Sequence, residues 1–170
     1  MVGMGEMDDR QRRWQVEITD QLPVLLARLL AAEDCAASPP KSHGVYLFSE
    51  NETPMYVGRT GRTERSLAKP GGGHSNFRTR RAGHIQPKHN QGTYAYRLAR
   101  IGFTEAGGVL STSRDANCAN PVFMEHFREQ CMRVKAMQFG VVEIDNDRLA
   151  AVFEIYATTI LETTNSFATS

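Results

Sequence analysis

Two short runs of strand-forming residues, separated by a polar turn, constrain the fold of this chain most strongly. Residues 44–49 and residues 54–58 are dominated by aliphatic and aromatic side chains, whereas residues 50–53 between them are polar. Such a pattern predicts a β-hairpin. A connection of odd length would place Tyr46 and Tyr56 opposite each other on one face of the sheet.

A leucine-rich helix is expected before this hairpin. Its stripe of apolar residues at helical spacing is Leu22, Leu25, Leu26, Leu29 and Leu30. Thr19 or Asp20 would cap the helix, so that Pro23 lies in the first turn, where its missing N–H costs nothing. Residues 1–13 are polar and are expected to form a loose tail.

The rest of the chain predicts several helices and one further strand. Ser75 would cap a short helix that runs to His84, and residues 94–101 suggest another helix. Residues 107–120 look like a loop, residues 121–132 a helix, residues 133–144 a strand and residues 148–162 a final helix. The fold class is therefore α+β, with a small, three-stranded, mainly antiparallel sheet flanked by helices. We expect residues 1–40, the tail and added N-terminal helix, to pack on a main domain of residues 41–170.

Membrane insertion and export are not expected. The longest apolar run, residues 22–32, contains Pro23 and Arg28 and is shorter than the roughly 20 residues that a membrane-spanning helix needs. The N-terminus lacks the apolar stretch of a secretory peptide. The cysteines are odd in number and widely spaced, so they predict reduced thiols in a cytoplasmic protein. They are Cys35, Cys118 and Cys131.

Positive charge is concentrated in one quarter of the sequence, although the whole chain has a formal net charge of only +1. Between Arg59 and Arg100 there are ten Lys and Arg residues and one acidic residue, Glu64. A concentrated basic block can release counterions from a polyanion, so nucleic acid is the natural partner. The duller interpretation, a solvated basic loop, stays open on charge alone.

Five short features occur in the order typical of one nuclease family. Gly44-Val45-Tyr46 and Tyr56-Val57-Gly58 resemble the two tripeptides of the GIY-YIG nuclease superfamily. The family then has an Arg followed four residues later by a His, a Glu on a late helix, and an Asn shortly after it. The matching residues are Arg80, His84, Glu154 and Asn165. The resemblance covers roughly residues 43–167.

The resemblance implies a metal-dependent endonuclease that hydrolyses phosphodiester bonds. Glu154 would hold one Mg²⁺ ion, with Mn²⁺ as a substitute, and Arg80 would clamp the scissile phosphate. Tyr46 would help deprotonate the attacking water, with His84 accepting or relaying the proton. Tyr56 would add a hydrogen bond, and Asn165 would maintain the geometry of the site.

The spacing also makes physical sense without the family name. Residues four apart share a helix face, so Arg80 and His84 would project together. Glu154 borders an apolar helical stripe, and it would lie on nearly the same side as Asn165 if that helix continued. Because there is one carboxylate in the set, the chemistry predicted is single-metal hydrolysis.

Further basic residues are expected to hold the nucleic-acid backbone without reading its sequence. They are Arg59, Arg62, Arg78, Arg81 and Lys88. DNA is the expected partner, and RNA remains open. A single active centre cuts one strand, so cleavage of both strands would require a homodimer or sequential nicking.

The same residues have other interpretations. The main alternative is a catalytically inactive nucleic-acid-binding module of the same fold. Tyr46 and Tyr56 taken alone would be packing residues of a sheet, and Asn165 is equally well explained as a helix C-cap. Residues 58–63 do not have the spacing of a phosphate-binding P-loop. The histidines and cysteines lack the compact spacing of zinc ligands.

Overall fold

The computed structural model describes residues 9–61, 75–88 and 90–163, and its centre is a three-stranded antiparallel sheet. The strands are β1 (Gly44–Glu50), β2 (Thr53–Arg59) and β3 (Gln138–Glu143), in the order β2-β1-β3. The predicted hairpin is confirmed. Its two turn residues, Asn51 and Glu52, have φ angles of 50° and 65°, as a two-residue hairpin turn that matches the twist of the strands requires.

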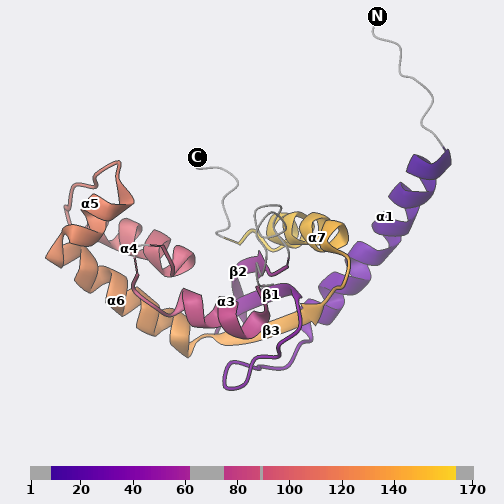
Figure 1. Ribbon diagram of the computed structural model, residues 1–170, viewed down its shortest axis with the longest axis horizontal. Coiled ribbons are helices and arrows are strands. Elements are labelled where there is room, and N and C mark those ends of the chain that lie inside the picture. Colours follow the sequence, from indigo (N-terminus) through magenta and orange to yellow (C-terminus); the bar gives the residue numbers. More distant parts are fainter. Residues whose placement is uncertain (1–8, 62–74, 89, 164–170) are drawn as a thin grey trace, which may run out of the picture.

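Six helices surround the sheet within the described residues (Figure 1). They are α1 (Asp9–Leu30), α3 (Phe77–His84), α4 (Thr93–Glu105), α5 (Arg114–Ala119), α6 (Pro121–Ala136) and α7 (Asp147–Ile160). The expectation of an α+β class with a small antiparallel sheet is confirmed. None of the helices described is long and apolar enough to cross a membrane.

Each face of the sheet has its own core, because successive strand residues point to opposite sides. Val45 and Leu47 of β1 pack with residues of α1 and α7. Tyr46 and Phe48 pack on the other face, in an aromatic core shared with α3, α4 and α6. Figure 1 shows α4, α5 and α6 grouped on one side of the sheet, while α1 extends from the other. The fold therefore separates an aliphatic layer from an aromatic one.

The expected start of the N-terminal helix is wrong. Helix α1 begins at Asp9, inside the predicted tail, so Pro23 lies in the interior of the helix and not in its first turn. The Thr19 hydroxyl donates to the carbonyl of Gln15 at 2.8 Å, and so does not cap this helix. The interior proline is tolerated because Leu25 and Leu29, which follow it, are buried against the sheet.

Three other boundaries differ from the prediction. The N-cap of α3 is Asn76 and not Ser75, because Asn76 forms a reciprocal capping box with Thr79. The expected loop of residues 107–120 contains α5, capped by Ser113. Helix α6 continues to Ala136, so residues 133–136 are helical and not part of the strand. At its end Arg133 binds both carboxylate oxygens of Glu50 in the hairpin, at 3.0 and 2.6 Å.

The register of the hairpin also corrects one expectation. Tyr46 is paired with Gly58 and Tyr56 with Phe48, so the two tyrosines are diagonal neighbours and not directly opposite. They still share one face, with ring centroids 6.2 Å apart. A Cβ atom built on Gly58 would lie 2.4 Å from the Tyr46 hydroxyl oxygen. The Tyr46 ring therefore lies across β2 in space that only glycine leaves open.

Helix α7 is shorter than expected at its C-terminal end. It stops at Ile160, and Glu162 adopts a φ of 49°, in the left-handed region that terminates helices. Glu154 and Asn165 were expected on one side of a helix that continued past residue 160, and α7 does not continue that far. Asn165 itself lies outside the described residues.

We predict that Gly58→Ala lowers the free energy of unfolding by about 1–3 kcal/mol, because the added methyl group overlaps the buried Tyr46 ring. Urea denaturation measures this change. Gly83→Ala is the matched control, since a Cβ there meets nothing within 4 Å. The control is expected to be neutral or slightly stabilising, as alanine is favoured over glycine in a helix. Equal stability of the two variants would contradict the packing described for Tyr46.

Candidate active site

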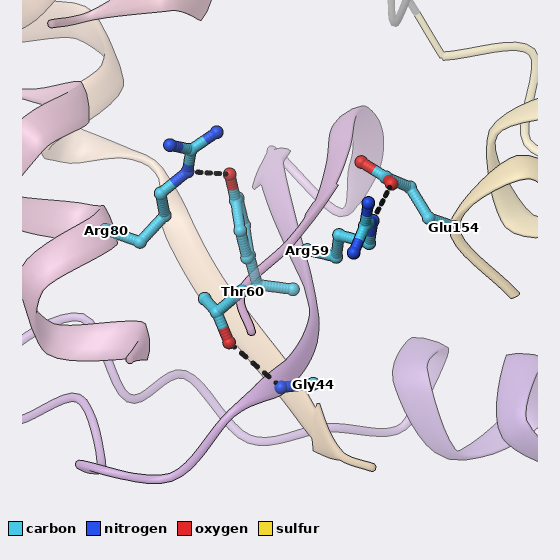
Figure 2. Close-up of polar contacts among 6 residues, drawn as sticks. Gly44, Arg59, Thr60, Arg80 and Glu154 are labelled. Atoms are coloured by element: carbon cyan, nitrogen blue, oxygen red, sulfur yellow. Dashed lines mark hydrogen bonds and ion pairs between the residues drawn. The ribbon is translucent and has the colours of Figure 1, made fainter. Parts of the chain in front are cut away.

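The hydroxyl group of Tyr46 is the centre of the candidate site. The Tyr46 side chain is fully buried, and its oxygen lies 2.7 Å from Nε2 of His84. Nε of Arg80 donates to the same oxygen at 3.3 Å (Figure 2). Sequence reasoning proposed these three residues together, and the fold brings them into direct contact.

The local structure of α3 explains why Arg80 and His84 reach the same oxygen. The capping box at Asn76 sets the start of the helix, and Phe77 anchors the first turn in the aromatic core. Residues four apart then project from one face, as expected from the spacing. Arg80 is exposed, whereas His84 is only 3% exposed, so this face passes from solvent into the core.

His84 is held in its neutral form. Burial, assisted by the nearby Arg80 guanidinium, lowers the pKa of His84 to about 3. Since Arg80 can only donate, the Tyr46 oxygen accepts that bond, and its own proton is available for Nε2 of His84. This arrangement requires the imidazole proton on Nδ1, which has no hydrogen-bond partner among the described residues.

Tyr46 and Tyr56 are both neutral in this structure. Burial and the proximity of Tyr56 raise the pKa of Tyr46 well above its ordinary value, and Arg80 opposes this only in part. Burial also raises the pKa of Tyr56, whose ring stacks on Tyr94 at a centroid distance of 4.6 Å. The desolvation of the buried Tyr46 hydroxyl group therefore outweighs the effect of the nearby Arg80 cation.

Glu154 approaches the site from the opposite side, on α7. Its Oε2 accepts from Nε of Arg59 at 3.0 Å, and the two side chains are 20% and 34% exposed. Burial raises the pKa of Glu154, and Arg59 and Arg80 oppose the shift. In Figure 2 Glu154 and Arg59 stand on one side and Arg80 on the other.

The glycines of the two tripeptides leave the space in which the Tyr46 ring and the neighbouring strands approach each other closely. Gly58 leaves room for the Tyr46 ring to lie across β2, the edge strand that α7 also contacts. Gly44 has a φ of 149°, and a Cβ atom there would lie 2.1 Å from the carbonyl oxygen of Val142 on β3. The Gly44 amide donates to the hydroxyl of buried Thr60 at 2.9 Å, which ties β1 to the end of β2.

The fit of this site to a divalent cation depends on Glu154. Within the described residues no three His, Cys, Asp or Glu side chains gather into a group that could hold a metal. Mg²⁺ nevertheless commonly takes only one or two carboxylates and fills its shell with water and phosphate oxygens. In Figure 2 the second oxygen of Glu154 points toward the side on which Arg80 lies. The set fits Mg²⁺ or Mn²⁺ with Glu154 as the one protein ligand, in competition with Arg59.

The basic residues expected to bind nucleic acid differ in their contacts within the fold. Arg59 pairs with Glu154, a partnership that the sequence did not predict. Nε of Arg78 donates to the carbonyl of Pro39 at 3.3 Å, and Arg81 donates to the carbonyl of Lys135 at 3.1 Å. Lys88 is exposed. Arg62 lies outside the described residues, as does Asn165.

A polar cavity of about 310 Å³ opens beside the Arg80 and His84 pair. Its walls come from α3, from residues 90–92 and from the first residue of α4, and they include Thr79, Gln91 and Thr93. Sequence reasoning missed this neighbourhood because α4 contributes no residue to the recognised motifs. The one signal available was the absence of acidic residues from α3 through most of α4.

Comparisons with models of protein families, with curated proteins and with solved structures found no match to this chain. The case for a function therefore depends on the geometry of the residues themselves. That geometry brings Arg80 into contact with buried Tyr46, which also contacts buried His84, and pairs Glu154 with Arg59 near enough to influence Tyr46.

We predict a pH dependence of stability that originates in His84. Its folded pKa of about 3 lies below the ordinary value of 6.5, so below pH 6.5 the unfolded chain binds the proton and the folded chain does not. The contribution of neutral His84 to the free energy of unfolding is therefore fully present above pH 6.5. It is lost as the pH falls toward 3, at up to about 1.4 kcal/mol per pH unit. Urea unfolding of wild type and His84→Gln across this range should show a steeper loss in the wild type. Parallel slopes would mean that His84 is not buried as a neutral imidazole.

Proposed function

We propose that this protein is an endonuclease that hydrolyses phosphodiester bonds in DNA with the help of a divalent cation. The observation that carries the proposal is the Tyr46 hydroxyl, bound between His84 and Arg80. A buried phenol with a proton acceptor on one side and a phosphate-binding cation on the other is suited to activating water beside a phosphate. The family resemblance of residues 43–167 points to the same chemistry.

Arg80 is the residue proposed to bind the scissile phosphate. Its Nε donates to the Tyr46 oxygen, and its two terminal nitrogens can donate to two phosphate oxygens in a forked arrangement. The positive charge then offsets the negative charge that builds up on the phosphate during attack. Arg80 would thereby place the phosphorus atom next to the Tyr46 hydroxyl.

Tyr46 and His84 are proposed to act as a proton relay and not as a preformed phenolate. The water O–H gives its proton to the Tyr46 oxygen while the Tyr46 proton passes to Nε2 of His84. Tyr46 stays neutral overall because it gains one proton as it loses the other, so the low pKa of His84 makes this transfer unfavourable in the free protein. A bound phosphate is expected to lessen that cost, because its negative charge stabilises the imidazolium that forms.

Glu154 is the proposed metal ligand. A divalent cation there would supply positive charge next to the phosphate and its leaving oxygen. Arg59 holds the carboxylate in place and opposes the rise in the Glu154 pKa that burial causes. Tyr56 supports Tyr46 from the same sheet face and is itself oriented by stacking on Tyr94.

The alternative of an inactive DNA-binding module has two observations in its favour. Arg59 already bonds to the Glu154 carboxylate that a metal would use, and the phenols are neutral. The two candidates differ in one measurable property, because only the nuclease converts bound DNA to a cleaved product.

We predict that Glu154→Gln lowers the rate of Mg²⁺-dependent plasmid nicking by at least about a hundredfold, since the amide is a poor ligand for the cation. DNA binding in the absence of metal should be retained. Glu129→Gln, at an exposed position of α6, removes the same charge away from the site and should nick at the wild-type rate. Undiminished nicking by Glu154→Gln would remove the proposed metal role. Absence of nicking in the wild type with both Mg²⁺ and Mn²⁺, while DNA is bound, would favour the inactive module.

We also predict that Tyr46→Phe abolishes most of the nicking activity while the aromatic core is kept. The lost hydroxyl leaves Nε2 of buried His84 without its partner, so stability should fall by about 1–3 kcal/mol. Phe48→Leu, in the same core but without a polar atom, is the control for a change of stability alone. Comparable nicking by Tyr46→Phe and the control at a temperature where both are folded would require another proton acceptor.

A further inference from the structure

One face of α4 carries a row of cationic and hydroxyl side chains that the proposed mechanism does not use. Thr93, Arg97, Arg100 and Thr104 follow one another at intervals of three or four residues, so they lie in line along the helix. The opposite side of α4 is apolar, and Ala95 and Ala99 on it are fully buried. The row therefore faces away from the core over about 16 Å of helix.

This row begins at the candidate active site. Thr93 lines the polar cavity that Arg80 and His84 also line. Tyr94, the next residue, stacks on Tyr56, and the positive charge of Arg97 is near enough to lower the pKa of Tyr56 against the effect of burial. Farther along, Arg97 and Arg100 line a second cavity, of about 450 Å³, with Ile101, Thr104, Glu105 and Leu110.

The charge of this region is complementary to a polyanion. From Asn76 to Thr104 the sequence has no Asp or Glu. Its cations are Arg78, Arg80, Arg81, Lys88, Arg97 and Arg100. Arg78 and Arg81 are bonded to backbone carbonyls, whereas Arg100 is exposed on α4. The first acidic residue that follows the row along the sequence is Glu105, at the last position of the helix.

We infer that the Arg97 and Arg100 face of α4 binds the phosphate backbone of duplex DNA next to the scissile bond. The inference rests on the proposed nuclease function and assigns it a binding surface. The DNA strand leaves the Arg80 phosphate site past Thr93 and runs along α4, where the two guanidinium groups contact successive phosphates. Such contacts fix the position of the duplex without reading its bases, so this surface provides affinity and not sequence preference.

The salt dependence of binding tests this surface independently of cleavage. Each phosphate contact with a duplex contributes about 0.9 to the slope of log affinity against log salt concentration. Arg97→Gln/Arg100→Gln should therefore reduce the slope by about 2 and weaken binding on the order of tenfold to a hundredfold at 0.1 M salt. Fluorescence anisotropy with a labelled duplex of about 25 base pairs, in EDTA so that no cleavage occurs, measures both quantities.

Two further variants separate electrostatics from folding. Arg28→Gln/Arg128→Gln removes the same charge from exposed positions of α1 and α6 and should leave the slope unchanged. Arg97→Lys/Arg100→Lys keeps the charges and should retain most of the slope. Arg100→Gln alone, at the exposed member of the pair, should reduce the slope by about 1, and it tests the surface even if changes at Arg97 disturb Tyr56.

The possible outcomes distinguish the inference from the function on which it rests. Wild-type binding with equal slopes for the Arg97/Arg100 and Arg28/Arg128 variants overturns the α4 surface and leaves the nuclease proposal intact. A wild-type protein that neither binds the duplex at low salt nor nicks plasmid overturns both. A reduced slope in the Gln pair, rescued by the Lys pair, supports the surface.

Discussion

The placement of the Tyr46 ring over Gly58 is the contact on which the rest of the site depends. Because β2 has no side chain at this position, a fully buried tyrosine on the central strand can extend its hydroxyl group toward the edge of the sheet. Helix α3 then supplies His84 and Arg80 to that oxygen. Any larger residue at position 58 would displace the ring, and the polar groups would lose their common centre.

Burial gives this site its electrostatic character. Removal of water favours the neutral forms of both Tyr46 and His84, while the exposed Arg80 keeps its charge at the rim. Glu154 has an ionic partner in Arg59, which is a common requirement for a partly buried carboxylate. In the proposed mechanism these groups are therefore in resting forms in the free protein, and substrate and metal would supply the charges that change them.

Local patterns predicted some elements well and others poorly. The hairpin and the Arg80–His84 spacing depend on residues close in sequence. The two-residue period of a strand and the 3.6-residue period of a helix were therefore sufficient to predict them. The boundary between α6 and β3 was misplaced because Val134, Met137 and Phe139 suit either structure. The pairing of Arg133 with Glu50 in the distant hairpin is one tertiary contact that accompanies the helical form. Similarly, α1 tolerates Pro23 because the leucines beyond it are buried.

The amino-acid order alone established the hairpin, the basic segment and the identity of the candidate residues, since each is written in short-range spacing or in composition. It did not establish that Arg59 pairs with Glu154, that the two tyrosines are diagonal, or that Arg97 of α4 lies close to Tyr56. Those relationships join side chains from different strands and helices. They arise only when strand register and helix packing are settled together, because both depend on burying side chains that are far apart along the chain.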